Sequence, residues 1–361
     1  MKPISNATAP DGATADVTVI TAAYSMDRWP LTIAAVNSVL AQTVRPREII
    51  LPIDHNRELF ERLRDHWAAK ADPSDPPIMV VESKYDGHLG ASATTAAEMA
   101  SGRFIAFLDD DAEADPDWLH NILAPLEDPS VIAVGGAPLP VYSRPRPSWF
   151  PSEFDWVFGC AYTGLPTRAA PILHLIGTTM AVRRSDLLAI GGIHSNDHGD
   201  MELSHGLARH APGSRLIYEP AAVVRHFVHQ DRLTWAYFWR RCFFVNRSKA
   251  AAMRHMGMAR NLRAERSFAR RALTNGVRRN LRAVFRGDGG GFLRAFAICA
   301  GLGLAGAGYA TATVEWHLGR RPSPSSLGWI GSVEPTGTAA SDPGDRRAQR
   351  GAPERIGDRQ G

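Results

Sequence analysis

Cysteine is scarce in this sequence. The three cysteines, Cys160, Cys242 and Cys299, are spread over 361 residues, and no two of them form a CxxC pair. This scatter argues against a disulfide framework and against a cysteine-based structural zinc site. It suits a protein that works in a reducing cytosol.

A hydrophobic run of the kind found in secretory signals is also absent. The N-terminal stretch MKPISNATAPDGATAD contains one lysine and no apolar core. We therefore predict a flexible leader over residues 1–15. Residues 319–361 consist largely of Pro, Ser, Gly and charged side chains and are predicted to be disordered.

Acidic residues are almost missing from one segment. Between Arg240 and Arg286 the chain carries fourteen Lys and Arg and a single acid, Glu265, although its net charge is only +4. The rest of the chain is therefore net acidic. The basic segment has no nucleic-acid-binding motif and few aromatic residues, so we do not expect a nucleic-acid partner.

An apolar stretch, residues 292–316, directly follows the basic segment. Residues 295–314 reach the ~20 needed to span a bilayer, but their many Gly and Ala make them weakly hydrophobic. Arginines next to such a stretch suit an anionic membrane surface. We expect peripheral attachment at the cytoplasmic, inner face of the cell membrane. A true span and a buried helical hairpin are the alternatives.

Short apolar strands alternate with helices in the first hundred residues. Strands are predicted at 17–21, 48–54, 78–83 and 104–110, and helices at 29–42, 58–70 and 91–101. This alternation predicts an α/β fold with a parallel, doubly wound sheet and ligands beyond the carboxyl ends of its strands. Residues 130–235 are expected to add strands and loops, and residues 236–286 to be mostly helical.

Three consecutive aspartates, Asp109–Asp111, directly follow the apolar strand. In extended chain Asp109 and Asp111 point to the same side and Asp110 points away. Two such carboxylates suit Mg²⁺ or Mn²⁺, with water and phosphate oxygens completing the shell. A calcium loop is not predicted, because Ala114 and His120 replace its glycine and glutamate. A solvated acidic turn is the alternative, and the position after a strand favours a site.

A second group of polar residues lies in HGDMELSHGLARH, residues 198–210. Asp200 and Glu202 fall at the start of a predicted helix, where backbone N–H groups favour negative charge. Simple N-capping by Asp200 is the alternative. The histidines His194, His198, His205 and His210 have irregular spacing without an HExxH motif, so a zinc site is not expected.

Two further features of the sequence suggest roles in a site. A strand is predicted to end at His226, with Arg232 after it, and a purely structural histidine is the alternative there. Aromatic side chains gather at residues 149–158, and such rings stack on sugar faces. We expect at least three of the five (Trp149, Phe150, Phe154, Trp156 and Phe158) to be core residues, and Trp156 to contact a sugar.

Taken together, residues 16–250 resemble family 2 glycosyltransferases with the GT-A fold. The resemblance rests on VITAAYSMDRWPLTIAAVNSVLAQTVRPREIILPID, on FLDDDAEADPDWL, on GDMEL and on His226. The blocks WFPSEFDWVFGCAYTGLP and YFWRRCFFVNRSKA are similar to a glucosyl-dolichyl phosphate glucuronosyltransferase-like subgroup. The resemblance implies a GT-A domain over residues 16–250, followed by a basic, membrane-associating helical extension over residues 251–318.

The resemblance also implies roles for individual residues. Asp109, Asp111 and His226 would bind the divalent metal. Asp110 would contact the ribose of the nucleotide or the water shell of the metal. The nucleotide base, expected to be uracil, would be held by Thr21, Ala23, Tyr24 and Asp54.

The acceptor side is implied in the same way. Asp200 would be the general base of an inverting transfer, and Glu202 would orient the acceptor or Asp200. Contacts to the sugar or the acceptor would come from Trp156, Gly177 and Arg232. For Arg232, assistance to a phosphate and a surface salt bridge are alternatives.

The sequence therefore predicts a metal-dependent inverting glycosyltransferase. It would move a sugar from a UDP-sugar to a saccharide or a polyprenyl-phosphate-linked acceptor. Two alternatives are a sugar-phosphate nucleotidyltransferase-like enzyme and a weakly active binding or scaffold relative. The chain departs from the family in GHLGASATTA, where an Arg-Asn pair is common, and at Gly199 and Met201 beside Asp200.

Overall fold

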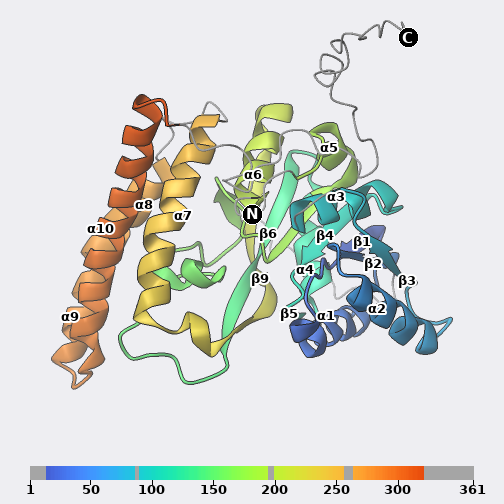
Figure 1. Ribbon diagram of the computed structural model, residues 1–361, viewed down its shortest axis with the longest axis horizontal. Coiled ribbons are helices and arrows are strands. Elements are labelled where there is room, and N and C mark those ends of the chain that lie inside the picture. Colours follow the sequence, from blue (N-terminus) through green and yellow to red (C-terminus); the bar gives the residue numbers. More distant parts are fainter. Residues whose placement is uncertain (1–13, 86–88, 194–198, 256–262, 321–361) are drawn as a thin grey trace, which may run out of the picture.

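A mixed β-sheet with helices on both faces forms the centre of the protein (Figure 1). The computed structural model describes residues 14–85, 89–193, 199–255 and 263–320. The strand order is β3-β2-β1-β4-β8-β6-β9-β5, and β7 pairs with β9 off this path. Residues 1–13 of the predicted leader and most of the predicted disordered tail lie outside the described residues. The last two residues of the predicted leader are ordered, since Thr14 forms a parallel bridge with Arg45 and the N–H of Ala15 donates to the Arg45 carbonyl oxygen.

The first four strands of this order are parallel. They are β3 (Ile78–Glu82), β2 (Glu48–Ile53), β1 (Val17–Ile20) and β4 (Phe104–Leu108). Every residue of β1, β2 and β4 is buried, as expected for parallel strands covered on both faces. The predicted elements of this half are all present, with ends shifted by at most two residues.

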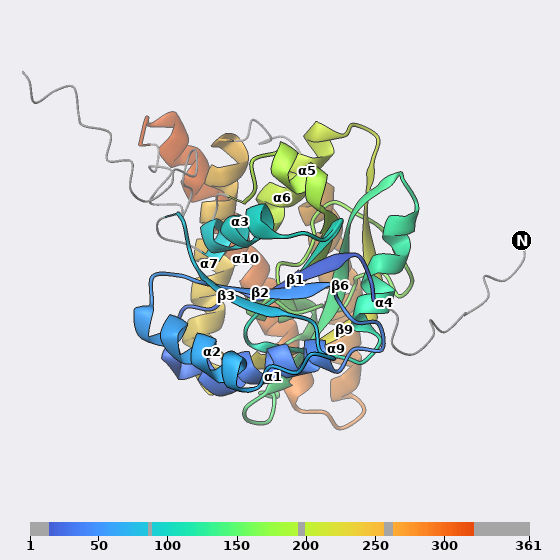
Figure 2. The same cartoon turned by 90° about the vertical axis from the view of Figure 1, so that its right-hand side faces the viewer.

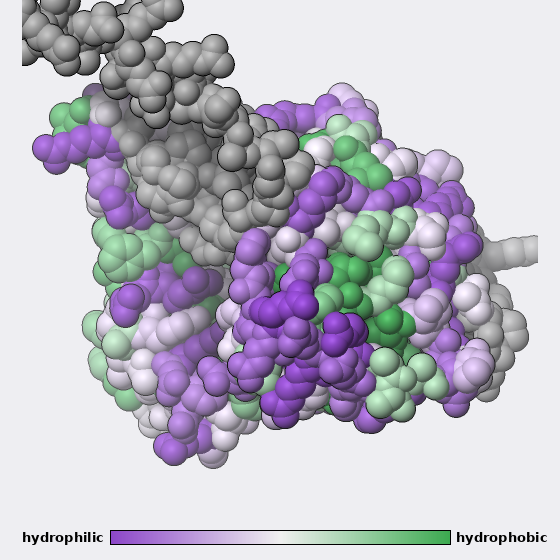
Figure 3. Space-filling model, turned by 45° about the vertical axis from the view of Figure 1, so that its right-hand side comes forward, coloured by the Kyte–Doolittle hydropathy of each residue, from purple (hydrophilic) through white to green (hydrophobic). Residues whose placement is uncertain are grey.

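Different helices cover the two faces of this parallel half (Figure 2). One face packs on α1 (Trp29–Leu40) and α2 (Arg57–Ala69) through aliphatic side chains such as Val36 and Leu63. The other face packs on the alanine-rich α3 (Leu89–Met99), α5 (Arg184–Ala189) and α6 (Gly199–His210). The face of the protein in Figure 3 is mostly hydrophilic, with a hydrophobic patch right of its centre.

The other half of the sheet is mixed. Strand β8 (Thr179–Arg183) pairs antiparallel with β4 and with β6 (Val131–Tyr142), and β6 pairs parallel with β9 (Arg215–Val228). The short strands β5 (Ala112–Ala114) and β7 (Ala170–Ile172) pair antiparallel with β9. The helix α4 (Trp118–Leu123) and the 3-10 turn η2 (Ala124–Glu127) link β5 to β6. Because β5 follows the aspartates directly, its pairing brings them to β9.

Four helices complete the described chain. They are α7 (Trp235–His255), α8 (Arg263–Arg271), α9 (Val277–Val284) and α10 (Gly290–His317), with a π-helical turn η5 (Ala272–Gly276) between α8 and α9. Helix α10 is long and apolar enough to cross a membrane by length and composition. The predicted domain boundary at residue 250 falls inside α7.

The aromatic block forms a core with these C-terminal helices. Phe150, Phe154 and Phe158, around the 3-10 segment η3 (Ser152–Phe158), are at most 3% exposed and pack with Phe238 of α7 and Ile298 of α10. The expectation that at least three of the five aromatics are core residues is confirmed. Helix α10 is therefore joined to the rest of the protein by a shared hydrophobic core.

Candidate active site

The aspartate turn and β9 meet at one edge of the sheet. In the antiparallel pairing of β5 with β9, Ala112 lies opposite His226, and the N–H of Phe227 donates to the carbonyl oxygen of Asp111 over 2.8 Å. This register places the imidazole beside the aspartates, with 3.1 Å between His226 Nε2 and Asp111 Oδ1. Strand β9 does not end at His226 as predicted but continues to Val228, because β6 pairs with it up to that residue.

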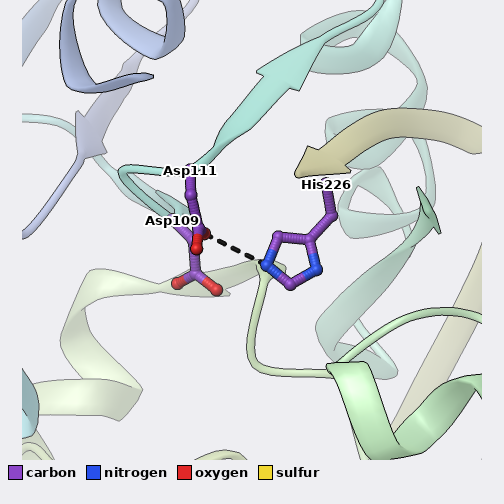
Figure 4. A group of neighbouring side chains, drawn as sticks. All are labelled: Asp109, Asp111 and His226. Atoms are coloured by element: carbon purple, nitrogen blue, oxygen red, sulfur yellow. Dashed lines mark hydrogen bonds and ion pairs between the residues drawn. The ribbon is translucent and has the colours of Figure 1, made fainter. Parts of the chain in front are cut away.

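Asp109, Asp111 and His226 form the group best suited to a metal ion (Figure 4). One candidate ligand atom from each residue lies within 4.8 Å of the others. Asp111 and His226 are buried, whereas Asp109 is only half-buried, so the cluster is open on the Asp109 side. Two carboxylates and an imidazole suit Mn²⁺ or Mg²⁺, and an open side leaves positions for water or phosphate oxygens.

Electrostatics distinguish the three carboxylates. Burial, together with the charge of Asp111, raises the pKa of Asp109. Burial also opposes ionisation of Asp111, but the hydrogen bond with His226 and the charge of Arg28 hold its pKa below the ordinary value. Burial raises the pKa of Asp110 to about 7, although Arg28 acts against the rise. Closely packed carboxylates are stable here only with cationic partners.

Arg28 is a residue of the candidate site that the sequence analysis missed. It ends the 3-10 turn η1 (Met26–Arg28), and its Nη1 lies 2.6 Å from Asp110 Oδ1 and 3.2 Å from Asp111 Oδ2. Its guanidinium also lies 5.0 Å from the centre of the Tyr24 ring. Asp110 lies outside the group of three candidate ligands and pairs with Arg28, which also reaches Asp111. The sequence indicates this contact only by the place of Arg28 in the loop after β1, the strand that pairs with β4.

Side chains behind the metal group fix its orientation. Cys160 Sγ lies 3.3 Å from the second ring nitrogen of His226, Nδ1. Partners of this kind set the tautomer and the orientation of a ligating histidine. The backbone N–H of Asp109 donates to the carbonyl oxygen of Thr178 over 3.1 Å, and the Thr178 hydroxyl donates to Gly159. The loop before β8 thus holds Asp109 in place.

Asp200 lies on the other side of that same loop. It is in the first turn of α6, where its Oδ1 accepts the N–H of Met201 over 2.7 Å. A methyl group added at Gly177 would lie 3.6 Å from the Asp200 Cβ. Since Gly177 precedes Thr178, a single dipeptide contacts both Asp200 and Asp109. Burial raises the pKa of Asp200, and a raised pKa makes a carboxylate better suited to accept a proton.

Glu202 follows two residues later and points to a different side of α6, since helix positions i and i+2 do not face each other. It is buried, with 7% of its surface exposed. On the next turn, His205 Nε2 lies 3.1 Å from His174 Nε2. Within the described ranges, Asp109, Asp111 and His226 are the only group of three or more potential metal ligands, and His194 and His198 lie outside those ranges.

The predicted base-binding residues gather at the carboxyl ends of β1 and β2. Ala23 and Ile53 form an isolated parallel bridge, and the N–H of Asp54 donates to the carbonyl oxygen of Ala23 over 3.0 Å. Tyr24 is 40% exposed, whereas Thr21 is fully buried. Ala23, Tyr24 and Asp54 therefore form one continuous edge next to Arg28.

Arg232 and Trp156 are the remaining residues predicted to contact the sugar or the acceptor. The charge of Arg232, in the 3-10 turn η4 (Gln230–Arg232), contributes to the lowered pKa of Asp111, so Arg232 lies near the cluster. Among the described residues it makes no side-chain ion pair. Trp156 is half-buried, and its ring centroid lies 5.8 Å from that of Phe154 in the aromatic core.

Comparison with known proteins agrees with this arrangement. Residues 18–191 match the family profile described as Glycosyl transferase family 2. The glucosyl-dolichyl phosphate glucuronosyltransferase of Haloferax volcanii is 32% identical over 245 residues, which cover 64% of this chain and 76% of that protein. The chain belongs to glycosyl transferase family 2. As a member of this family it is a glycosyltransferase.

Two further proteins are similar to parts of this chain or to its fold. The O-antigen biosynthesis protein RfbC of Myxococcus xanthus is 32% identical over 112 residues, 30% of this chain and 8% of that protein. The mannosyltransferase PcManGT of Pyrobaculum calidifontis, solved with GDP-Man and Mn²⁺, is 21% identical with a TM-score of 0.54. The superposition covers 87% of this chain and 90% of that one. The predicted GT-A fold is confirmed.

Proposed function

We propose that this glycosyltransferase uses a divalent metal to transfer a sugar from a UDP-sugar, with inversion, to a saccharide or lipid-linked acceptor. The observation that carries the proposal is the Gly177–Thr178 dipeptide. It contacts the candidate base Asp200 on one side and binds the backbone of the candidate metal ligand Asp109 on the other. A donor bound at Asp109 would therefore present its anomeric carbon close to Asp200.

The charged residues around the aspartate turn would bind the nucleotide-sugar donor. Asp109, Asp111 and His226 would hold the cation, which neutralises the negative charge that develops on the leaving diphosphate. Arg232 adds a positive charge near this group and would contact a phosphate. The base would rest on the edge formed by Ala23, Tyr24 and Asp54, with the fully buried Thr21 behind it. Asp110 would contribute through its ion pair with Arg28.

The acceptor side centres on Asp200. An acceptor hydroxyl loses its proton as it attacks the anomeric carbon, and a carboxylate with a raised pKa is matched to receive it. One direct displacement by the acceptor inverts the anomeric configuration. Glu202 would orient the acceptor or Asp200, Gly177 leaves room beside Asp200, and Trp156 would contact a sugar ring.

A lipid-linked acceptor and attachment to the inner face of the membrane are included in the proposal. The relative from Haloferax volcanii acts, by its name, on a glucosyl-dolichyl phosphate. The basic segment and the apolar helix α10 support attachment to an anionic surface.

A panel of UDP-sugars with Mn²⁺ tests the proposal. We expect UDP release that requires both an acceptor and metal and that is lost in Asp111→Ala and Asp200→Asn. NMR of the product reports the anomeric configuration, and retention would contradict the inverting step. Formation of a UDP-sugar from UTP and a sugar phosphate would instead identify a nucleotidyltransferase. Tight nucleotide binding without transfer from any donor would identify a binding or scaffold protein.

A further inference from the structure

Helix α10 presents two different faces. At two glycines its inner face contacts the protein too closely for a methyl group. A methyl group at Gly308 would lie 2.2 Å from the Phe243 carbonyl oxygen of α7. A methyl group at Gly301 would lie 2.7 Å from the Phe154 ring. The helix thus packs along its length against α7 and the aromatic core (Figure 1).

This packing is incompatible with a transmembrane orientation. Helix α7 runs beside α10 and carries five Lys and Arg, namely Arg240, Arg241, Arg247, Lys249 and Arg254. If α10 crossed the bilayer, α7 would bring those cations into the hydrocarbon region at a large cost in free energy. Near the end of α10, Arg247 and Glu315 form an ion pair of 2.7 Å that would also enter the membrane.

The outer face of α10 is exposed and uncharged over its length. Exposed positions recur three or four residues apart, at Phe292, Phe296, Cys299, Gly303, Gly306, Ala310 and Val314. They span about 33 Å at 1.5 Å per residue. Phe292, Phe296 and Val314 are 64%, 55% and 57% exposed. An apolar stripe of this length in contact with water indicates an interaction surface.

Helix α9, which packs against α10, carries exposed arginines. Arg278, Arg282 and Arg286 are all exposed, and beside them Phe285 at the end of α9 is 90% exposed. The acid in the turn to α10, Asp288, is paired with Arg294. Exposed aromatic side chains next to exposed arginines are typical of helices that lie in the headgroup region of an anionic bilayer.

We infer that α9 and the outer face of α10 form an in-plane docking surface for an anionic lipid bilayer, with Phe285 and Phe292 inserted among the acyl chains. This surface is called the α9–α10 face below. A second copy of the chain is a poorer fit, since self-association through this face would bring like-charged arginines together. The inference deepens the membrane attachment in the proposed function and does not depend on the transfer chemistry.

Flotation of the full chain with vesicles tests the hydrophobic part of the α9–α10 face. Vesicles with about 30% anionic lipid are compared with neutral ones, without donor, acceptor or metal. We expect binding to anionic vesicles and a loss of at least about tenfold in the double variant Phe285→Ser/Phe292→Ser. Met99→Ser, which alters a 51% exposed side chain on α3, is the control and should bind normally.

A matched pair of triple variants tests the arginines. Replacing Arg278, Arg282 and Arg286 with Gln should weaken binding by at least about tenfold. The same replacement of Arg57, Arg62 and Arg64, which are exposed on α2, removes equal charge and should have little effect. Equal losses in both triples would overturn the specific surface in favour of net charge alone.

Three other results would overturn the inference. Wild-type protein that stays in solution with anionic vesicles would show that this face does not dock. A concentration-dependent dimer that the double Phe variant abolishes would assign the face to a second copy. Resistance to extraction by alkaline carbonate would indicate a span. Because no reaction is measured, none of these results bears on sugar transfer.

Discussion

Arg28 Nη1 lies 2.6 Å from Asp110 Oδ1 and 3.2 Å from Asp111 Oδ2. One guanidinium thus bridges two of the three adjacent carboxylates. The two acids raise the pKa of Arg28 although burial acts in the opposite direction, so the arginine stays charged. Arg28 therefore balances part of the negative charge of the aspartate turn when no metal is bound.

Arg28→Met should lower the thermal stability of the metal-free protein more than that of the metal-loaded protein. The variant leaves buried carboxylates without their cation, at a cost of about 3 kcal/mol, and Mn²⁺ can replace part of the lost charge. Melting curves with EDTA and with Mn²⁺ measure the difference. Arg64→Met, on exposed α2, is the control. An equal loss under both conditions would show that Arg28 has no link to the metal site.

Asp111→Asn should weaken Mn²⁺ binding by roughly 100-fold, since it removes one of two anionic ligands and the partner of His226. Cys160→Ala should weaken it less, because it alters only the orientation of the imidazole. Titration calorimetry with Mn²⁺ and no nucleotide gives both values. Unchanged affinity in Asp111→Asn would place the metal elsewhere.

Asp200→Asn should lower kcat by about 10³-fold with little change in the affinity for UDP, because the base acts on the acceptor. Burial raises the pKa of Asp200, so the base is protonated at low pH. The wild-type rate should therefore rise with pH through a value above the ordinary aspartate pKa. A pH profile without this limb, or a large loss of UDP affinity in Asp200→Asn, would contradict the assignment.

The pair His174 and His205 should make the protein sensitive to acid. Burial lowers the pKa of His174 to about 3, from 6.5. Below pH 6.5 the imidazole of His174 is therefore protonated in the unfolded chain but stays neutral in the native state. Stability is full above that pH and falls by about 1.4 kcal/mol per unit as the pH drops toward 3. Urea unfolding at several pH values should give a shallower decline for His174→Gln, and an unchanged one for the exposed His317→Gln.

Two glycines of α10 should respond oppositely to alanine. Gly308→Ala places a methyl group against backbone atoms of α7, and we expect a loss of roughly 2–3 kcal/mol in the free energy of unfolding. Gly303 has no atom within 4 Å of such a methyl group, so Gly303→Ala should be neutral or stabilising by up to about 1 kcal/mol. Chemical denaturation measures both, and equal effects would contradict the packing of α10.

Local patterns were sufficient for much of the fold. The apolar runs that became β1, β2 and β4 are buried on both faces, and such strands are visible in a sequence because every position is apolar. The carboxylates of Asp109 and Asp111 were predictable because they directly follow such a strand. The implied ligand His226 came from resemblance, since a histidine in a strand carries no indication of its distant partner.

The sequence by itself determined which residues can form strands, where the three aspartates lie, and that a basic segment precedes an apolar helix. These properties depend on neighbours along the chain. Only the tertiary structure decided that Arg28 pairs with Asp110, that one dipeptide joins Asp200 to Asp109, and which face of α10 is exposed. Those contacts join segments far apart in the chain, so their geometry depends on how the sheet and helices pack.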